Sequence, residues 1–255
     1  AGAGGGGEQS GGAQSGSAQS GSAQGAQSGS DIVTEADLLP LGLFSANLQG
    51  TWRRLYSTSC DGIDFNRVAW ACLGYEGPTC VLIKTQGENP TVLGAVANDR
   101  WKESNRFFGS SQDILFTLSP KLRLYRSTGS SSAYQWLNTK SYSSSHGMGF
   151  GGTVDGFRLF IPDTLEHCTA SDSCPTYEAG RLVEGGRFEI QALEVWGCGG
   201  EAVVERALRA RALQREVESE TINKARSCDR AAFFGEFDQE MFLSKTMAHR
   251  SAGKR

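Results

Sequence analysis

Short apolar segments separated by turn residues occupy the middle of the chain. Thr79–Thr85 and Thr91–Ala97 are rich in β-branched and apolar residues, and a Gly-Glu-Asn-Pro turn sequence separates them. This pattern predicts a β-hairpin. Asp113–Leu118 and Leu122–Arg126 flank a Ser-Pro-Lys turn and predict a second hairpin in the same way. The pattern predicts three further strands, at residues 52–58, 134–138 and 187–196.

One amphipathic helix is predicted among these strands. Asp64 is placed as its N-cap, and Gly74 is placed to end it. Between them, apolar residues recur at helical spacing, at Phe65, Val68, Ala69, Cys72 and Leu73. A parallel α/β fold would need helices between successive strands, and the sequence does not offer them. The expected fold is therefore mainly β with a few helices (α+β), with two antiparallel sheets packed as a β-sandwich.

The stretch Gly147–Ile161 combines five glycines in its first ten residues with an alternating apolar end. We expect a glycine turn that feeds a buried strand, with Phe157, Leu159 and Ile161 on one face. A phosphate-binding loop is the alternative, but the stretch lacks the lysine and the following helix that such a loop needs. We therefore interpret the glycines as a packing hinge. Valine at Gly151 or Gly152 is expected to disturb folding before any chemistry.

Composition divides the chain into three parts. Residues 1–30 contain one charged residue, Glu8, and repeat Ala-Gln-Ser-Gly-Ser, which is typical of a flexible low-complexity linker. Because the chain begins with Ala, we expect a fragment or a processed product with more sequence upstream. Residues 31–200 carry the strand pattern and form the predicted sandwich domain. Residues 201–255 form a predicted C-terminal helix and docking tail.

The C-terminal part changes in character after the last strand. Residues 201–226 contain no Gly or Pro and are rich in Ala, Arg, Glu and Leu, which favours a helix. Val204, Leu208, Leu213 and Val217 predict a narrow apolar stripe along it. A second amphipathic segment follows, and its large apolar residues include Phe233, Phe234, Phe237, Met241 and Phe242. We expect these side chains to pack on the sandwich or on another protein.

Charge and hydropathy exclude several classes of protein. The formal net charge of -3 gives no basic footprint for nucleic acid. No apolar run approaches the roughly 20 residues that a membrane-spanning helix needs, and the start of the chain does not resemble a signal peptide. Seven cysteines, none in a Cys-x-x-Cys pair and several within apolar runs, predict reduced buried thiols in a cytosolic protein.

Candidate catalytic chemistry is sparse. With three histidines and no Gly-x-Ser-x-Gly motif, the sequence predicts no hydrolase triad. His167, Cys168 and Cys174 lack a second pair of zinc ligands, so we interpret them as a loop histidine and two loop thiols, with Cys168 and Cys174 kept as weak redox candidates. Asp155 lies in the expected glycine turn. Glu194 is either a perturbed acid, a solvent-facing residue or an acceptor for backbone amides in the turn.

Five sequence blocks in this order resemble those of TLDc domains. The blocks are Trp52–Ser59 with Asp61-Gly62; Gly77–Thr85 with Leu93-Gly94-Ala95; Phe107–Ser110 with Ile114–Pro120; Gly149–Gly152 with Phe157–Ile161; and Phe188–Trp196. The resemblance covers about residues 36–198. It implies structural or interface roles for Gly149, Phe150, Gly151, Gly152, Asp155, Glu194 and Trp196.

The resemblance also implies a function. TLDc proteins include oxidation-resistance proteins, have no established catalytic site, and are linked to binding and regulation of the vacuolar-type proton ATPase. The polar helix and its tail are similar to those of plant and green-algal members and of a lysosomal-signalling branch. We therefore expect a non-enzymatic interaction module without a cofactor, cytoplasmic and associated with an organelle membrane complex or a cilium. The alternatives are a structural component of a cytoskeletal or axonemal assembly and a thiol- or carboxylate-based antioxidant enzyme.

Overall fold

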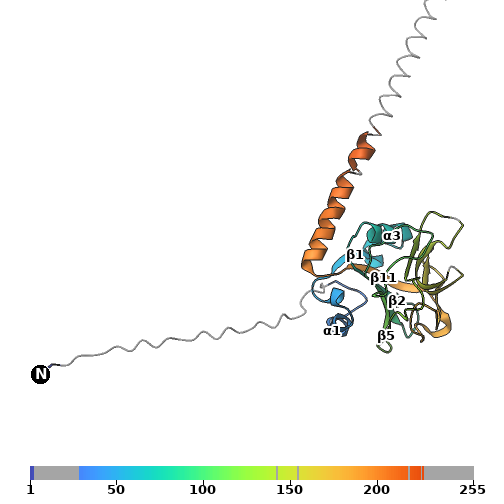
Figure 1. Ribbon diagram of the computed structural model, residues 1–255, viewed down its shortest axis with the longest axis horizontal. Helices are drawn as coiled ribbons and strands as arrows, with labels where there is room; N and C mark the ends of the chain where they lie inside the picture. The colour runs from blue at the N-terminus through green and yellow to red at the C-terminus, as the bar shows by residue number, and fades with distance from the viewer. Residues whose placement is uncertain (3–28, 142, 154, 218, 225, 227–255) are drawn as a thin grey trace, which may run out of the picture.

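The computed structural model (Figure 1) describes residues 1–2, 29–141, 143–153, 155–217, 219–224 and 226. Two antiparallel sheets form its body, and helices flank one of them. The elements are α1 (Glu35–Phe44), η1 (Ala46–Leu48), β1 (Arg53–Ser57), α2 (Thr58–Asp61), α3 (Phe65–Leu73), β2 (Thr79–Thr85), β3 (Val92–Ala97), β4 (Ile114–Ser119), β5 (Arg123–Tyr125), β6 (Gln135–Asn138), β7 (Gly147–Thr153), β8 (Gly156–Pro162), β9 (Cys168–Ala170), η2 (Glu184–Gly186), β10 (Arg187–Phe188) and β11 (Ile190–Gly197).

The predicted sandwich is confirmed. One sheet has six strands in the order β1-β11-β2-β3-β4-β5, and the other has five in the order β10-β9-β8-β7-β6. Both predicted hairpins form, as β2–β3 and β4–β5, and every pairing is antiparallel. The inner faces enclose a continuous core to which both sheets contribute, for example Val81 and Ile83 from β2 and Phe150 and Leu159 from the facing sheet.

The predicted strand at residues 187–196 is two strands in different sheets. Arg187–Phe188 forms β10 at the edge of the five-stranded sheet, and Ile190–Gly197 forms β11 between β1 and β2 of the other. Glu189 lies at the corner between them. The alternating sequence pattern continues through this corner, because both strands place apolar residues toward the same core. The pattern alone therefore does not show where the chain passes from one sheet to the other.

The glycines of Gly147–Ile161 lie in a strand, which corrects the expected glycine turn. Residues 147–153 form β7, and the turn to β8 lies two residues later, around Asp155. Phe157 also departs from the prediction. Its ring stacks on Phe160 at 4.4 Å, whereas Leu159 and Ile161 belong to the core between the sheets. The positive φ values of Gly151 and Gly152, 66° and 98°, interrupt the regular alternation next to this position.

A helical layer covers the outer face of the six-stranded sheet, and the strand pattern did not predict it. Leu41 of α1 and Leu48 of η1 are buried there, in a second cluster with Leu82, Phe116 and other residues of the sheet. Pro40 lies inside α1, where a helix interior disfavours proline. The burial of Leu41 on the sheet therefore accounts for this short helix better than intrinsic propensity does.

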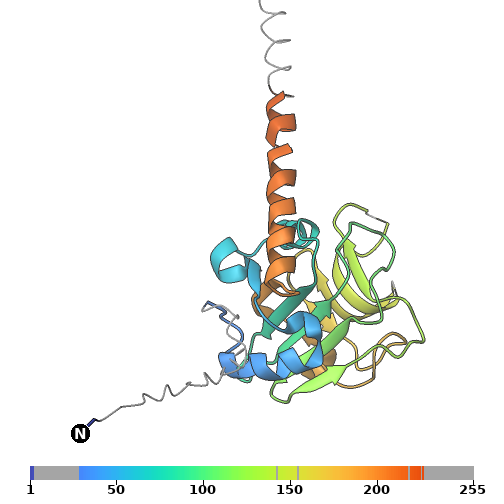
Figure 2. The same ribbon diagram turned by 60° about the vertical axis from the view of Figure 1, so that its left-hand side comes forward.

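The predicted internal helix is confirmed as α3. The side chain of Asp64 accepts a hydrogen bond from the backbone N–H of Asn66, and Gly74 is the C-cap. Val68 and Cys72 are buried, whereas Trp70 on the opposite face is 47% exposed. Residues 201–217 and 219–224 are helical and extend away from the sandwich in both views (Figures 1 and 2).

Candidate functional site

The first turns of the C-terminal helix contact the domain. Val204 and Ala207 are buried, and Arg211 is almost fully covered. The guanidinium groups of Arg211 and Arg215 both lie over the indole of Trp70, and the central carbon of each is 4.3 Å from its ring centroid. Two cations on one indole give a directional contact in addition to the apolar packing. This arrangement fixes the direction in which the helix leaves the domain.

Gly74 makes this contact possible from the side of α3. A Cβ at this position would lie 3.1 Å from Nε of Arg211. The same glycine that ends α3 therefore also leaves room for the arginine. Burial, and then the neighbouring Arg215, lower the pKa of Arg211. No described residue accepts a hydrogen bond from its Nε, so the helix base contains a covered cation whose main partner is an aromatic ring.

The predicted apolar stripe is split between two faces of the helix. Val204 is buried and Leu208 is half-buried, but Leu213 and Val217 are each 63% exposed. Leu213 follows Val204 by about two and a half turns, so the two side chains point in opposite directions. Ile222, further along, is 51% exposed. The helix therefore has an anchored base and a free part that projects from the domain (Figure 2). The free part exposes the large apolar side chains of Leu213, Val217 and Ile222.

Glu194 binds the N-terminal segment to the six-stranded sheet. Its side chain is fully buried, so it does not face solvent. The carboxylate accepts hydrogen bonds from Ser30 Oγ at 2.7 Å, from the backbone N–H of Asp31 at 2.8 Å and from Trp196 Nε1 at 2.8 Å. Ser30 Oγ in turn accepts from the N–H of Ile32. The amide that Glu194 binds thus belongs to the start of the domain and not to the glycine stretch.

The other residues of the glycine motif serve packing. Phe150 is fully buried and meets Trp101 edge to face at 5.6 Å. A Cβ at Gly149 would lie 2.5 Å from the ring of Phe157, and one at Gly151 would lie 2.6 Å from the ring of Tyr177. Missing side chains therefore allow aromatic rings to lie directly on the strand. Asp155 is exposed in the turn after β7.

The two redox candidates lie in different environments. Cys168 begins β9 and is fully buried, so it is not the loop thiol that we expected; burial, and then Glu189, raise its pKa to about 12. Such a shift disfavours the reactive thiolate. Cys174 is half-buried and accepts a hydrogen bond from the N–H of Tyr177 at 3.2 Å.

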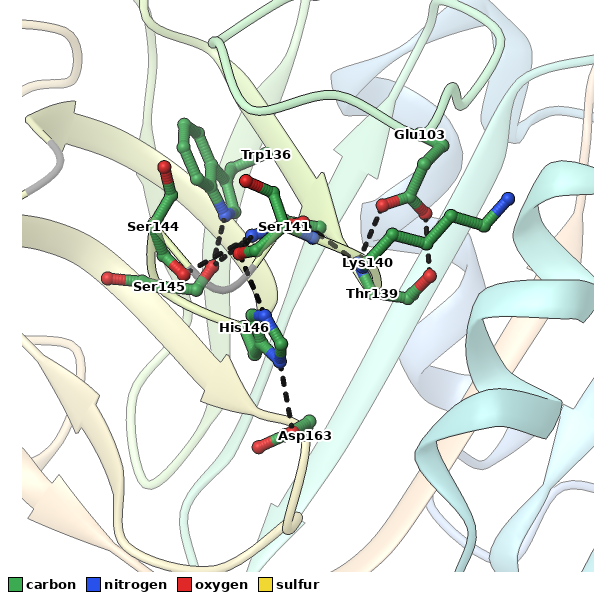
Figure 3. A network of polar contacts seen from close by, with 10 residues as sticks. Glu103, Trp136, Thr139, Lys140, Ser141, Ser144, Ser145, His146 and Asp163 are labelled. Atoms are coloured by element: carbon green, nitrogen blue, oxygen red, sulfur yellow. Dashed lines mark hydrogen bonds and ion pairs between the residues drawn. The ribbon is translucent and has the colours of Figure 1, made fainter.

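The histidine nearest to a catalytic arrangement has a structural role. His146 Nε2 lies 2.8 Å from the carbonyl oxygen of Ser141, to which only an N–H can donate, and Nδ1 lies 3.6 Å from Asp163 (Figure 3). Nε2 is therefore not free to act as a base. Nearby, Glu103 accepts hydrogen bonds from the backbone and the hydroxyl of Thr139. This network closes the loop between β6 and β7.

Asp113 is a buried carboxylate that the sequence reasoning missed. It precedes β4 and accepts hydrogen bonds from the N–H of Asn98 at 2.8 Å and from Gln135 Nε2 at 2.8 Å. Gln135 belongs to β6, so this bond joins the two sheets. Burial raises the pKa of Asp113 to about 6, although its hydrogen bonds oppose the shift. Only its position after a loop of polar residues marked it in the sequence.

The raised pKa of Asp113 predicts a pH-dependent stability. The folded protein holds this proton more tightly than the unfolded chain, so the contribution of Asp113 is most favourable below its ordinary pKa of 3.8 and is lost as the pH rises to about 6. The free energy of unfolding of wild type, relative to Asp113→Asn, is expected to fall by up to about 3 kcal/mol between about pH 4 and pH 7. Urea unfolding at each pH measures it. A difference that does not vary with pH contradicts the assignment.

Within the described ranges, no group of three or more His, Cys, Asp and Glu side chains is arranged to hold a metal ion. No helix in the same part of the chain is long and apolar enough to cross a membrane. The tail residues Phe233, Phe234, Phe237, Met241 and Phe242 lie outside the described residues.

A two-sheet domain with an outer helical layer and a projecting C-terminal helix defines a mainly β class of protein whose prominent exposed feature is that helix. The family is shown by sequence: residues 27–199 match the TLDc domain, and the chain belongs to this family. A Xenopus laevis relative, MTOR-associated protein MEAK7, is 32% identical over 154 residues, which are 60% of this chain and 33% of the relative.

Two further relatives match a similar share of this chain. The Danio rerio MTOR-associated protein MEAK7 is 32% identical over 169 residues, 63% of this chain and 37% of its own length. Oxidation resistance protein 1 of Xenopus tropicalis is 27% identical over 145 residues, 57% of this chain and 16% of its own length. The chain thus spans between 16% and 37% of the length of these three relatives. The similarity therefore concerns the matched domain and does not extend over the remainder of each relative.

Proposed function

We propose that this protein is a non-enzymatic interaction module that binds and regulates the vacuolar-type proton ATPase, in a role linked to resistance to oxidative stress. The observation that supports the proposal is the exposure of Leu213 and Val217 on a helix whose base is anchored. These side chains lie one turn apart on the same face, which is the spacing that a helix uses to fill a groove on a partner. The ATPase is chosen because of the TLDc family.

The anchored base supports this use of the helix. Trp70 and the two arginines around it hold the first turns in place, so a partner meets a helix that is already oriented. Binding then orders fewer residues, and less of the interaction free energy is lost to conformational entropy. A helix that carries apolar residues and remains unpaired in solvent is otherwise unfavourable, which is a reason to expect a protein surface opposite Leu213 and Val217.

The polar side chains support a non-enzymatic role. Glu194 holds the N-terminal segment, and Asp113 joins the two sheets. His146 directs Nε2 at a backbone carbonyl. Each of these groups is occupied by a structural contact that a catalytic acid or base would have to give up.

A second candidate partner is an assembly that contains mTOR. The observation in its favour is the name of two of the relatives, MTOR-associated protein MEAK7. Both candidates use the same helix and differ in the partner.

Affinity capture from detergent-solubilised organelle membranes tests the proposal. The bait is the full chain, and the captured proteins are identified by mass spectrometry. We expect subunits of the proton ATPase to be enriched over a bait that ends at residue 200. Enrichment of mTOR without ATPase subunits supports the second candidate. Failure to enrich either from a folded bait overturns the proposal.

A further inference from the structure

A cleft lies at the end of the sandwich that carries the turns of the two hairpins. Its volume is about 630 Å³, and its walls come from the β2–β3 turn, the β4–β5 turn and the segment that leads into β10. These segments are far apart in the sequence, and the two-sheet fold brings them together. The described residues of the C-terminal helix contribute nothing to this cleft, so the inference does not depend on the proposed function.

The cleft is strongly basic although the chain is not. Lys121, Arg123, Arg181 and Arg187 line it, and Glu184 is its one carboxylate. The whole chain has a net charge of -3, so this concentration of cations does not follow from its composition. Clustered like charges are unfavourable unless an opposite charge binds among them.

Three of these cations have no acidic partner in the described part of the chain. No carboxylate there lies within ion-pair distance of Lys121, Arg123 or Arg187. Arg181 pairs with Asp172 at 3.8 Å, and both side chains are more than half exposed. An exposed pair at this distance contributes little, and it leaves the arginine free to change partner.

The floor of the cleft is apolar. Leu182, Val183 and Phe188 line it and are largely buried, in the core between the two sheets. A cleft with an apolar floor and a cationic rim fits a ligand that carries both aliphatic side chains and carboxylates. A free phosphate would contact the cationic rim alone and leave the apolar floor uncovered.

We propose that this cleft binds an acidic peptide segment of a partner protein, with carboxylates on the four basic side chains and an aliphatic residue over the apolar floor. Arginine and carboxylate form paired, charge-assisted hydrogen bonds, which favours acidic side chains over other polar groups. The cleft and the C-terminal helix then provide two separate contacts with a partner.

Fluorescence anisotropy of the full chain with a labelled peptide of alternating Glu and Leu tests the inference. The variant Lys121→Glu with Arg187→Glu reverses two charges of the rim. Arg106→Glu with Lys140→Glu makes the same change at exposed positions outside the cleft. We expect the affinity for the peptide to fall about tenfold or more in the cleft variant and to remain within about twofold in the control. The affinity of wild type is expected to weaken as salt is added.

Two competitor measurements complete the test. The matched peptide of Gln and Leu is expected to bind far more weakly, because it lacks the charges. Inorganic phosphate is expected not to displace the acidic peptide at equal concentration. Equal binding of the Gln peptide, displacement by phosphate, or unchanged binding by a cleft variant that unfolds like wild type overturns the inference.

Discussion

Valine at Gly152 is expected to destabilise the domain by about 3 kcal/mol or more. Gly152 has a φ of 98°, which a β-branched residue rarely adopts. A Cβ there would also overlap the carbonyl oxygen of Gly156 across the β7–β8 pair. The clash is with backbone, so a change of rotamer cannot relieve it. Urea unfolding followed by circular dichroism measures the loss.

The same hairpin provides the control. A Cβ at Gly156 would meet no atom within 4 Å, so Gly156→Ala is expected to change the free energy of unfolding by less than about 1 kcal/mol. If Gly152→Val unfolds at the same urea concentration as wild type, the conclusion that this glycine is needed for packing of the strand is wrong. If the variant is stable and loses a partner, the strand belongs to an interface.

Alanine at Glu194 is expected to cost about 3 kcal/mol or more and to release the N-terminal segment. The substitution removes the acceptor of three hydrogen bonds, from Ser30, Asp31 and Trp196. The Trp196 donor is buried and would be left without a partner. Hydrogen exchange of the backbone amides of residues 30–33, together with urea unfolding, measures both effects.

Glu194→Gln separates the effect of the negative charge of this side chain from the effect of its volume. The amide keeps one acceptor oxygen, so we expect an intermediate loss of stability and of amide protection. Ser30→Ala removes one donor and one acceptor and should affect the N-terminal segment more than the sheets. Unchanged amide protection at residues 30–33 in Glu194→Ala shows that the carboxylate does not hold this segment.

Much of the fold follows from local patterns in the sequence. The sequence predicts the hairpins and α3 because each has a turn or a cap beside a periodic segment. In the β2–β3 hairpin this turn is Gly87–Pro90, and in α3 the cap is Asp64. The elements that were missed have opposing local signals. Pro40 argues against α1, and the strand across Glu189 shows no break where it changes sheets. Tertiary packing decides both.

The candidate site was predictable only in part. The residue composition predicts the C-terminal helix. It does not show which apolar residues of this helix pack on the domain and which face solvent, because that depends on the position of Trp70. Two of the partners of Glu194, Ser30 and Asp31, are more than 160 residues away, and Asp113 meets Gln135 across the two sheets. Such contacts depend on topology, which spacing along one chain does not specify.

The central claim is that the free part of the C-terminal helix binds the partner, and the affinity of the full chain for the purified vacuolar-type proton ATPase tests it most directly. Leu213→Asp with Val217→Asp places two charges on the exposed apolar face. Ala212→Asp with Asn223→Asp adds the same charge at other exposed positions of the helix. The account predicts a loss of affinity of about a hundredfold in the first variant and less than about threefold in the second. Equal affinity of wild type and the Leu213/Val217 variant would contradict it.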